Sequence, residues 1–401
     1  MAARNPKHRS HRWRRGPEQR SLKASLALWF RRLDTTQRLA VLMAPVAILG
    51  LAGALTALAV NGSSRGPRAA STTSKKPPRA VVSTTDPVKH TLRHRPICPL
   101  TGQPTTLAKI PQRPALGVKI GNDPASRPQT GLLHADIVYD AMAEGGITRY
   151  LAIFQCQQAG AIGPIRSVRW NDWHLLASYG HPILAFSGGI DQWDAVVASE
   201  SYLFDATASS YPTAAAYYRT ANRVPPWNLY TSTRALWALD PNHSPPPRQF
   251  SYSAKLPPGA TKASSVTIAN FGTAGSGAAN LTWTWSPSAG VWLRSYDGVP
   301  DVDSSGTQLR AHDVIIEYVS TVQGPYAESG TVPDTESITE GSGTAYILRN
   351  GHIEKGTWHC AAYGRLTQYR LANGHVMTLT PGNTWVELVP EGGNYPVSVR
   401  R

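Results

Sequence analysis

An uncharged stretch of 22 residues constrains this chain more than any other feature. It runs from Leu39 to Val60 and reads LAVLMAPVAILGLAGALTALAV. About 20 apolar residues at a helical rise of 1.5 Å cross the ~30 Å hydrocarbon core of a bilayer. The apolar core of a cleaved signal peptide is shorter, usually about 7–15 residues. The sequence therefore predicts an uncleaved transmembrane helix over 39–60, with a cleaved signal peptide as the alternative.

The basic residues of the chain are concentrated on either side of this stretch. Residues 1–38 carry 11 Lys and Arg against two acids, and residues 61–95 carry eight against one, whereas residues 96–401 carry 21 against 22. The net charge of +15 thus belongs to the N-terminal segments. The body is close to neutral, so its charge does not indicate a nucleic-acid partner. Basic residues that precede a span stay in the cytoplasm. We expect residues 1–38 to be a cytoplasmic leader, and the main body of this single-pass membrane protein to be extracytoplasmic.

Composition then changes twice along the exported part. Residues 61–95 are rich in Ser, Thr, Pro, Gly and basic side chains, which is typical of a flexible linker. Residues 96–240 mix strand-like and helix-like apolar patterns, up to a proline-dense segment at 240–249. Residues 250–398 contain only strand-like runs. We predict an α+β protein with a mixed α/β N-terminal domain (96–240) and a β-rich C-terminal domain (250–398).

Short β-branched and aromatic runs bounded by turn residues locate the expected strands. They are 115–120, 135–141, 148–155, 182–187, 265–270, 281–285, 291–295, 313–320, 344–350, 367–372, 375–379 and 384–389. Helical spacing predicts helices over 169–179 and 191–200.

Three cysteines remain for an exported body: Cys98, Cys156 and Cys360. An oxidising compartment favours one disulfide and one free thiol. A bridge between Cys98 and Cys156 would tie the end of the linker to the first domain. Cys360 follows His359, but neighbouring residues of a strand point to opposite faces, so we interpret Cys360 as a buried thiol rather than a nucleophile.

The common signatures of catalysis and cofactor binding are missing from the sequence. It has no CxxC, HExxH, GxSxG, GxxxxGK[ST] or GxGxxG pattern, so we predict no metal site, no cofactor and no assigned catalytic residue. The run from Asp301 to Gly306 resembles the start of a calcium loop, but position twelve is His312 rather than Glu. We interpret this run as a polar turn.

Arginines and carboxylates gather in one part of the first domain. Within 48 residues stand Asn122, Arg127, Asp136, Asp140, Glu144, Arg149, Arg166 and Arg169. Arg149 shares a strand face with Leu151 and Ile153, so its guanidinium needs a carboxylate partner, either Glu144 or Asp136. Arg166 and Arg169 flank Ser167 at the expected start of a helix, where backbone amides and two cations would suit a phosphate or carboxylate. An internal network that positions loops and an anion-binding site both remain open.

Several segments of the chain resemble a known family. CPLTGQP (98–104), GVKIGNDPASRPQTGL (117–132), HADIVYDAMAEGGITRYLAIF (134–154) and IGPIRSVR (162–169) are similar to the N-terminal half of the YerB-like envelope proteins. TAYILRNGHIEKGTW (344–358) and LTPGNTWVELVP (379–390) are similar to the C-terminal half. The resemblance implies a bacterial cell-envelope protein with two domains of unknown function and no established reaction.

The polar positions that recur in this family fall on residues that the pattern of charges already indicates. They are Asn122, Arg127, Gln129, Asp136, Glu144, Thr148, Arg149, Arg166, Ser167 and Arg169. Asp140 stands where relatives tend to carry Glu, which shortens that carboxylate. No Cys occurs before Cys98, so a helix replaces the lipid-modified cysteine of the family's lipoproteins as the anchor.

Three functions are compatible with these features. We favour a non-catalytic envelope protein that binds a wall polymer, its lipid-linked precursor or a wall-assembly enzyme. One alternative is an enzyme acting on anionic or pyrophosphate-linked wall-polymer precursors, with Arg149, Arg166 and Arg169 as a clamp and Asp136 or Glu144 as base or metal ligand. The other is a transmembrane sensor with a basic cytoplasmic tail.

Overall fold

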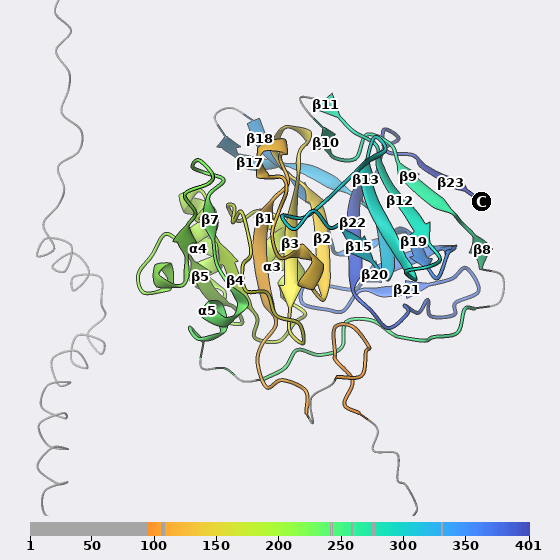
Figure 1. Cartoon of the computed structure of the whole chain (residues 1–401), viewed down its shortest axis with the longest axis horizontal. Helices are drawn as coiled ribbons and strands as arrows, with labels where there is room; N and C mark the ends of the chain where they lie inside the picture. The colour runs from red at the N-terminus through yellow and green to blue at the C-terminus, as the bar shows by residue number, and fades with distance from the viewer. Residues whose placement is uncertain are drawn as a thin grey trace, which may run out of the picture. The chain divides into compact units, whose positions relative to one another are not determined.

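The computed structural model describes residues 95–105, 109–240, 242, 244–257, 260–274, 277–329 and 332–401. The predicted leader (1–38), the predicted transmembrane helix (39–60) and the predicted linker up to residue 94 lie outside these residues. Among the residues that are described, no helix is long and apolar enough to cross a membrane. The described body is β-rich with few helices (Figure 1).

An 11-stranded sheet forms the centre of the body. Its main path follows the order β21-β20-β19-β16-β22-β2-β3-β1-β4-β5, and β8 pairs with β20. The strands are β1 (Leu116–Gly121), β2 (Ile137–Met142), β3 (Thr148–Phe154), β4 (Ile183–Phe186), β5 (Phe204–Thr207), β8 (Thr261–Lys262), β16 (Asp313–Val319), β19 (Gly341–Arg349), β20 (His352–Cys360), β21 (Gln368–Arg370) and β22 (Thr384–Pro390).

A second, six-stranded sheet follows the order β14-β13-β12-β9-β23, with β15 paired to β13. Its strands are β9 (Ser265–Ile268), β12 (Leu281–Ser286), β13 (Val291–Tyr296), β14 (Val299–Pro300), β15 (Arg310–Ala311) and β23 (Val397–Arg400). Three two-stranded ribbons complete the strands, formed by β6 (Tyr218–Arg219) with β7 (Leu229–Tyr230), β10 (Thr273–Ala274) with β11 (Gly277–Ala278), and β17 (Thr321–Ser329) with β18 (Val332–Ser337).

The α-helices of the described residues are short and all come from the N-terminal half. They are α3 (Trp170–Leu176), α4 (Asp191–Ser199) and α5 (Thr233–Trp237). Single 3-10 turns occur at η1 (Pro124–Ser126), η2 (Leu132–His134), η3 (Glu144–Gly146) and η4 (Thr213–Ala216). Helix α3 begins where the sequence predicts it but ends after seven residues.

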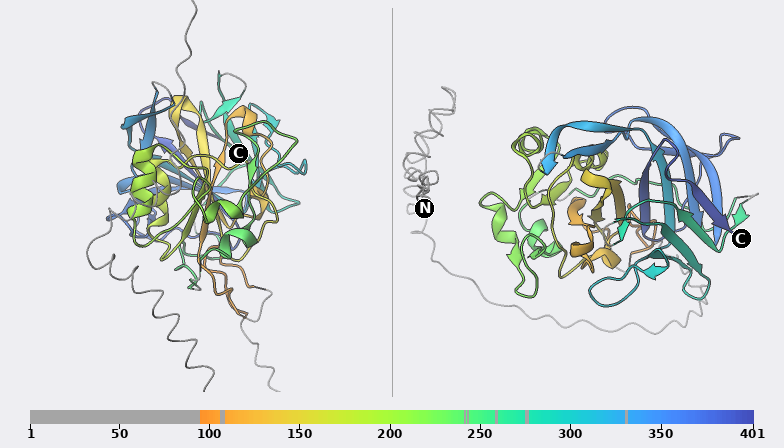
Figure 2. Two further views of the ribbon diagram at one scale, coloured as in Figure 1. Left: turned by 90° about the vertical axis from the view of Figure 1, so that its left-hand side faces the viewer. Right: turned by 90° about the horizontal axis from the view of Figure 1, so that it is seen from above.

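The central sheet is buried on both faces. Successive side chains of a strand point to opposite faces, so each central strand contributes to two cores. On one face, Val314 and Ile316 of β16 join a core with the Trp283 and Trp292 side chains of the six-stranded sheet. On the other face, Ile315 joins a core that includes residues of α3 and α4. Figure 2 shows the β17–β18 ribbon reaching from the C-terminal half across the top of the sheet toward the N-terminal half.

The two segments that the sequence predicts as separate domains share the central sheet. Strand β22, from the C-terminal segment, lies between β16 and β2 and pairs in parallel with both. The described residues accordingly belong to one compact unit. The sequence does not reveal this pairing, since a parallel contact between residues 247 positions apart leaves no local pattern.

Most expected strands form, with two informative differences. Residues 375–379 make only isolated bridges, in which Val376 pairs with Arg370 and Leu379 pairs with Tyr252. The nine-residue strand β20 and the β17–β18 ribbon were not expected. Both contain polar side chains at inward positions, such as Glu354 and Glu336, which hides the alternation typical of a strand.

A buried arginine joins the two sheets. Arg294 of β13 donates from Nη2 to Asp140 Oδ2 of β2 at 2.6 Å and from Nη1 to Asp301 Oδ2 at 2.5 Å. Its Nε lies 3.7 Å from Glu387 Oε1 of β22. Asp140 and Glu387 are direct partners in the β2–β22 register. These four charged side chains, each nearly or wholly inaccessible to solvent, therefore connect three strands from both halves of the chain.

A disulfide between Cys98 and Cys156 closes the start of the described body, with Cα atoms 6.1 Å apart. Cys156 follows the end of β3, so the bridge holds the entering chain at that edge of the sheet. Cys360 is free and buried, and its thiol contacts the Ala362 and Arg365 carbonyl oxygens at 3.4 Å.

We expect Arg294→Met to lower the free energy of unfolding by about 3–5 kcal/mol, because it leaves buried carboxylates without their cation. Urea denaturation of the full-length protein measures this loss. Arg310→Met, at an exposed position of β15, is the matched control and should change stability little. A loss below about 1 kcal/mol for Arg294→Met would show that the cluster is not a stabilising centre.

Replacement of Cys98 and Cys156 together by Ser should lower the free energy of unfolding by up to about 4 kcal/mol, as expected for a bridge with a sequence separation of 58. Thiol titration of the denatured, unreduced wild type should find one reactive thiol, from Cys360. Three reactive thiols in protein isolated from the envelope would contradict the bridge.

Candidate functional site

The carboxyl ends of the parallel strands bring most of the predicted site residues to one edge of the central sheet. Strands β16, β22, β2, β1, β4 and β5 run in one direction, and β3 runs antiparallel between β2 and β1. Asn122 follows β1, Glu144 follows β2, and Arg149 lies at the start of β3. In open sheets with parallel strands, ligands commonly bind at this edge. We call it the carboxyl edge.

Two arginines share the Glu144 carboxylate at this edge. Arg149 forms an ion pair with Glu144 Oε1, and Arg169 donates to Oε2 from Nε at 3.0 Å and from Nη2 at 2.9 Å. Burial alone would raise the pKa of Glu144, but the charges of Arg149 and Arg169 outweigh it and lower that pKa to about 2. Glu144 is thus the partner that the sequence requires for Arg149, and it is ionised throughout the neutral range.

Arg149 keeps unused hydrogen-bonding capacity despite this pairing. Its side chain is 2% exposed, and its Nε and Nη1 have no hydrogen-bond partner among the described residues. Burial and the nearby charge of Arg169 lower the pKa of Arg149 to about 10, so it remains a cation at neutral pH.

Arg166 is the least satisfied arginine of the group. Its side chain is 18% exposed, its Nε lies 3.9 Å from Asp123 Oδ2, and it donates no side-chain hydrogen bond to a described residue. Its aliphatic part packs close to Gly121, where an added Cβ would lie 2.7 Å from Arg166 Cγ. Gly121 is the register partner of Arg149, so the two arginines lie side by side at the edge.

The backbone near Ser167 does not provide the helix-start site that the sequence predicts. Helix α3 begins at Trp170, after Arg169, and has only seven residues. The Arg169 backbone amide donates to Asp172 Oδ2 at 2.7 Å, and Asp172 also pairs with Lys119. The Asp172 carboxylate therefore takes the backbone amide that an anion would need at the start of α3. Ser167 is half-buried.

Asn122 and Arg127 fix the loop after β1. Buried Asn122 donates from Nδ2 to Thr148 Oγ1 at 2.7 Å and to the Tyr296 hydroxyl at 3.0 Å. Arg127 donates to Asn122 Oδ1 at 3.0 Å and to the Thr273 carbonyl at 2.7 Å, and its guanidinium lies 4.3 Å from the centre of the Tyr296 ring. Both predicted site residues are occupied with internal contacts.

Asp136 lies at the opposite edge of the sheet from the arginines. It precedes β2 and accepts the backbone amides of Gln155 at 2.5 Å and Cys156 at 3.0 Å. Burial raises the pKa of Asp136 to about 7, although these amides and Arg113 oppose the shift. Asp136 precedes β2 and Glu144 follows it, so the two acids lie at opposite ends of this strand. Asp136 is therefore not the partner of Arg149.

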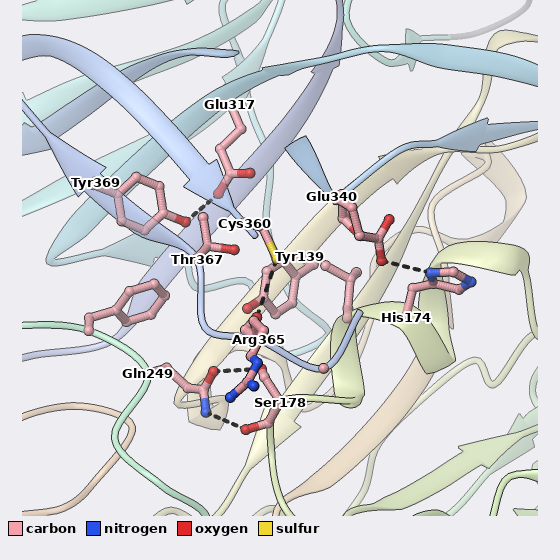
Figure 3. A pocket seen from close by; sticks show the side chains of 14 residues that line it. Tyr139, His174, Ser178, Gln249, Glu317, Glu340, Cys360, Arg365, Thr367 and Tyr369 are labelled. Atoms are coloured by element: carbon pink, nitrogen blue, oxygen red, sulfur yellow. Dashed lines mark hydrogen bonds and ion pairs between the residues drawn. The ribbon is translucent and has the colours of Figure 1, made fainter. Parts of the chain in front are cut away.

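The sequence did not predict a narrow cavity between α3 and the C-terminal strands (Figure 3). His174 Nδ1 and Glu340 Oε1 are hydrogen-bonded at 3.0 Å at its wall, and the Tyr369 hydroxyl donates to Glu317. Burial raises the pKa of Glu317 to about 7. The cavity volume is about 30 Å³, enough for one or two water molecules but not for a substrate. The sequence feature that could have indicated this cavity is Glu317, a single acid within the apolar strand DVIIEYV.

Comparison with known proteins places this architecture in a family. The model described as "Protein of unknown function (DUF3048) N-terminal domain" matches residues 100–244, and its C-terminal counterpart matches residues 272–386. The chain belongs to the DUF3048 family.

YerB of Bacillus subtilis (strain 168), whose name describes it as a candidate lipoprotein, is similar to this DUF3048 protein. The two are 26% identical over 311 residues, which cover 73% of this chain and 86% of YerB. The crystal structure of Bacillus subtilis YerB has the same fold, with a TM-score of 0.64 and 23% identity over 75% of this chain and 99% of that one.

Two other segments that the sequence analysis considered, Asp301–Gly306 and His359–Cys360, do not form a metal or nucleophile site in the described structure. Asp303 Oδ1 accepts the Ser305 amide at 2.8 Å and the Ser305 hydroxyl at 2.6 Å, as in a polar turn. His359 is exposed and Cys360 buried, and burial raises the pKa of the Cys360 thiol. The described residues contain no group of three or more His, Cys, Asp or Glu side chains that could hold a metal ion.

We expect Glu144→Gln to reduce the free energy of unfolding by about 3 kcal/mol at pH 7, because the folded protein holds this carboxyl ionised far below its ordinary pKa. The deficit should be complete above the unfolded pKa of about 4.5 and should disappear as the pH falls toward 2. Denaturation curves between pH 7 and pH 3 test this. A deficit independent of pH would mean that the ion pairs are not its cause.

Proposed function

We propose that this DUF3048 protein is a non-catalytic binding protein of the bacterial cell envelope. Residues 39–60 anchor it in the cytoplasmic membrane with its N-terminus inside, and the described body is extracytoplasmic. The Cys98–Cys156 disulfide supports this location, because such bonds persist in oxidising compartments. The similarity to a Bacillus protein named as a lipoprotein also supports attachment to a membrane.

The partner that fits the carboxyl edge best is an anionic group of a wall polymer or of its lipid-linked precursor. One observation carries this proposal: Arg149 and Arg166 lie side by side with guanidinium nitrogens that lack hydrogen-bond partners among the described residues. Unpaired N–H groups of arginine are costly when buried and form strong, directional hydrogen bonds with phosphate or carboxylate oxygens. The exposed part of Arg166 would meet the anion first.

Binding is favoured over catalysis by the state of the carboxylates. A general base works best with a pKa near the working pH, whereas the pKa of Glu144 is about 2. Asp136, the other base considered from the sequence, is at the opposite edge of the sheet beside Cys156. Neither carboxylate is suited to take a proton from a substrate held by Arg149 and Arg166.

The entering chain and the arginines lie at opposite edges of the central sheet. Cys98 is bonded to Cys156 beyond the end of β3, at the edge opposite the arginines. In Figure 1 this entering segment is at the bottom and the β17–β18 ribbon at the carboxyl edge is at the top.

The direct test is calorimetric titration of the full-length protein in detergent with inorganic pyrophosphate as the probe. Arg166→Ala should weaken binding by about tenfold or more, as expected for the loss of a charge-assisted contact, while circular dichroism stays unchanged. Arg310→Ala is the control for loss of an exposed arginine.

Two results would overturn this proposal. Equal affinity of the wild type and Arg166→Ala would remove the anion site from the carboxyl edge. Release of inorganic phosphate from pyrophosphate or from a lipid-linked precursor, lost in Glu144→Gln, would establish the enzymatic alternative.

A further inference from the structure

A shallow groove lies next to Arg166 at the carboxyl edge. It has a volume of about 460 Å³ and is lined by Ala125, Ala221, Asn222, Arg223, Val224 and Trp227. The groove thus runs between the turn that follows β1 and the loop that joins β6 to β7. Its apolar wall is open to solvent, since Val224 is 66% exposed and Trp227 is half-buried.

A single carboxylate connects the groove to the arginines. Asp123 Oδ1 accepts the Trp227 indole N–H at 2.7 Å, and its Oδ2 lies 3.9 Å from Arg166 Nε. Arg223 links the two walls, because its guanidinium donates to the Ser126 carbonyl at 2.9 Å and to the Pro128 carbonyl at 3.1 Å. Asp123 therefore lies between the indole ring and the guanidinium.

The charge of the surrounding segment is uniformly positive. Residues 206–239 contain three arginines and no Asp or Glu, in a described body that is otherwise close to neutral. The same segment holds two more exposed aromatic side chains, Tyr211 at 91% and Tyr218 at 47%. In the groove itself, the exposed Val224 side chain offers apolar surface, and Arg166 is the nearby cation beyond Asp123.

We propose that this groove, together with Arg166, binds a phosphate-bearing saccharide. The inference rests on the proposed anion site and names the class of group attached to the anion. The C–H face of a pyranose ring packs against the Trp227 and Val224 side chains, because both surfaces are apolar. The phosphate accepts hydrogen bonds from the partly exposed Arg166 guanidinium, and the exposed Asn222 amide can exchange hydrogen bonds with sugar hydroxyls.

Three probes separate the parts of this site in calorimetric titrations of the full-length protein: N-acetylglucosamine 1-phosphate, N-acetylglucosamine and inorganic phosphate. The sugar phosphate should bind about tenfold tighter than phosphate, by the contribution of the ring contact. Trp227→Leu should reduce the affinity for the sugar phosphate to that for phosphate, while Arg166→Ala should weaken both. Trp285→Leu, at a half-buried tryptophan of the six-stranded sheet, is the matched control.

A second variant guards against loss of structure, because the Trp227 indole also supports Asp123. Val224→Asp leaves every described hydrogen bond of the loop in place and puts a negative charge on the exposed wall. It should weaken binding of the sugar phosphate by about tenfold or more, and Val224→Asn should weaken it less.

The outcomes distinguish the saccharide groove from the anion site on which this inference rests. Phosphate binding that depends on Arg166, with no gain from the sugar and no effect of Trp227→Leu, would overturn the saccharide groove and leave the anion site standing. Absence of binding by all three probes would overturn both. Tighter binding of uridine monophosphate than of the sugar phosphate would show that the wall takes an aromatic base instead.

Discussion

The parallel pairing of β2 with β22, closed by the Arg294 cluster, is the contact on which the rest of the structure depends. It makes one sheet from two distant parts of the chain. Burial raises the pKa of Glu387 well above its usual range, and it also raises the pKa of its register partner Asp140. Asp140 Oδ1 and Glu387 Oε2 have no hydrogen-bond partner among the described residues, and a proton shared between the two carboxyl groups would satisfy both atoms. Arg294 is then balanced by the carboxylates of Asp140 and Asp301.

The geometry of the candidate site follows from this sheet. Strand β3 pairs with both β2 and β1, so Arg149 lies between Ala141 and Gly121 in register. That register brings the Glu144 turn, the Asp123 turn and Arg166 to one edge. The same pairing sends Asp136 to the other edge, beside the disulfide that holds the entering chain. The separation of the arginines from the entering chain, at opposite edges of the sheet, is thus a consequence of strand direction.

Local patterns in the sequence predict strands β1 to β4 and the need of Arg149 for a carboxylate, and the motifs predict the family. They do not predict the short strands β5, β6 and β7. They do not predict which acid pairs with Arg149. Glu144 is nearer to Arg149 in sequence than Asp136 is, but only the direction of β2 shows that Glu144 lies at the same edge as Arg149. Arg294 was also missed, although it alternates with Trp292 and Tyr296 on one face of β13, which indicates an inward-facing arginine. Trp227 gave no signal because its partner Asp123 is 104 residues away.

Native-state hydrogen exchange on the full-length protein tests the central claim most directly, because it reports the free energy of opening for each strand. If one sheet unites both halves, the amides of β2 and β22 should exchange last and with the same free energy, equal to that of global unfolding. Exchange of β1 to β5 as a separate unit, with β22 still protected, would contradict the account. It would show that the N-terminal half opens without breaking the pairing on which the site depends.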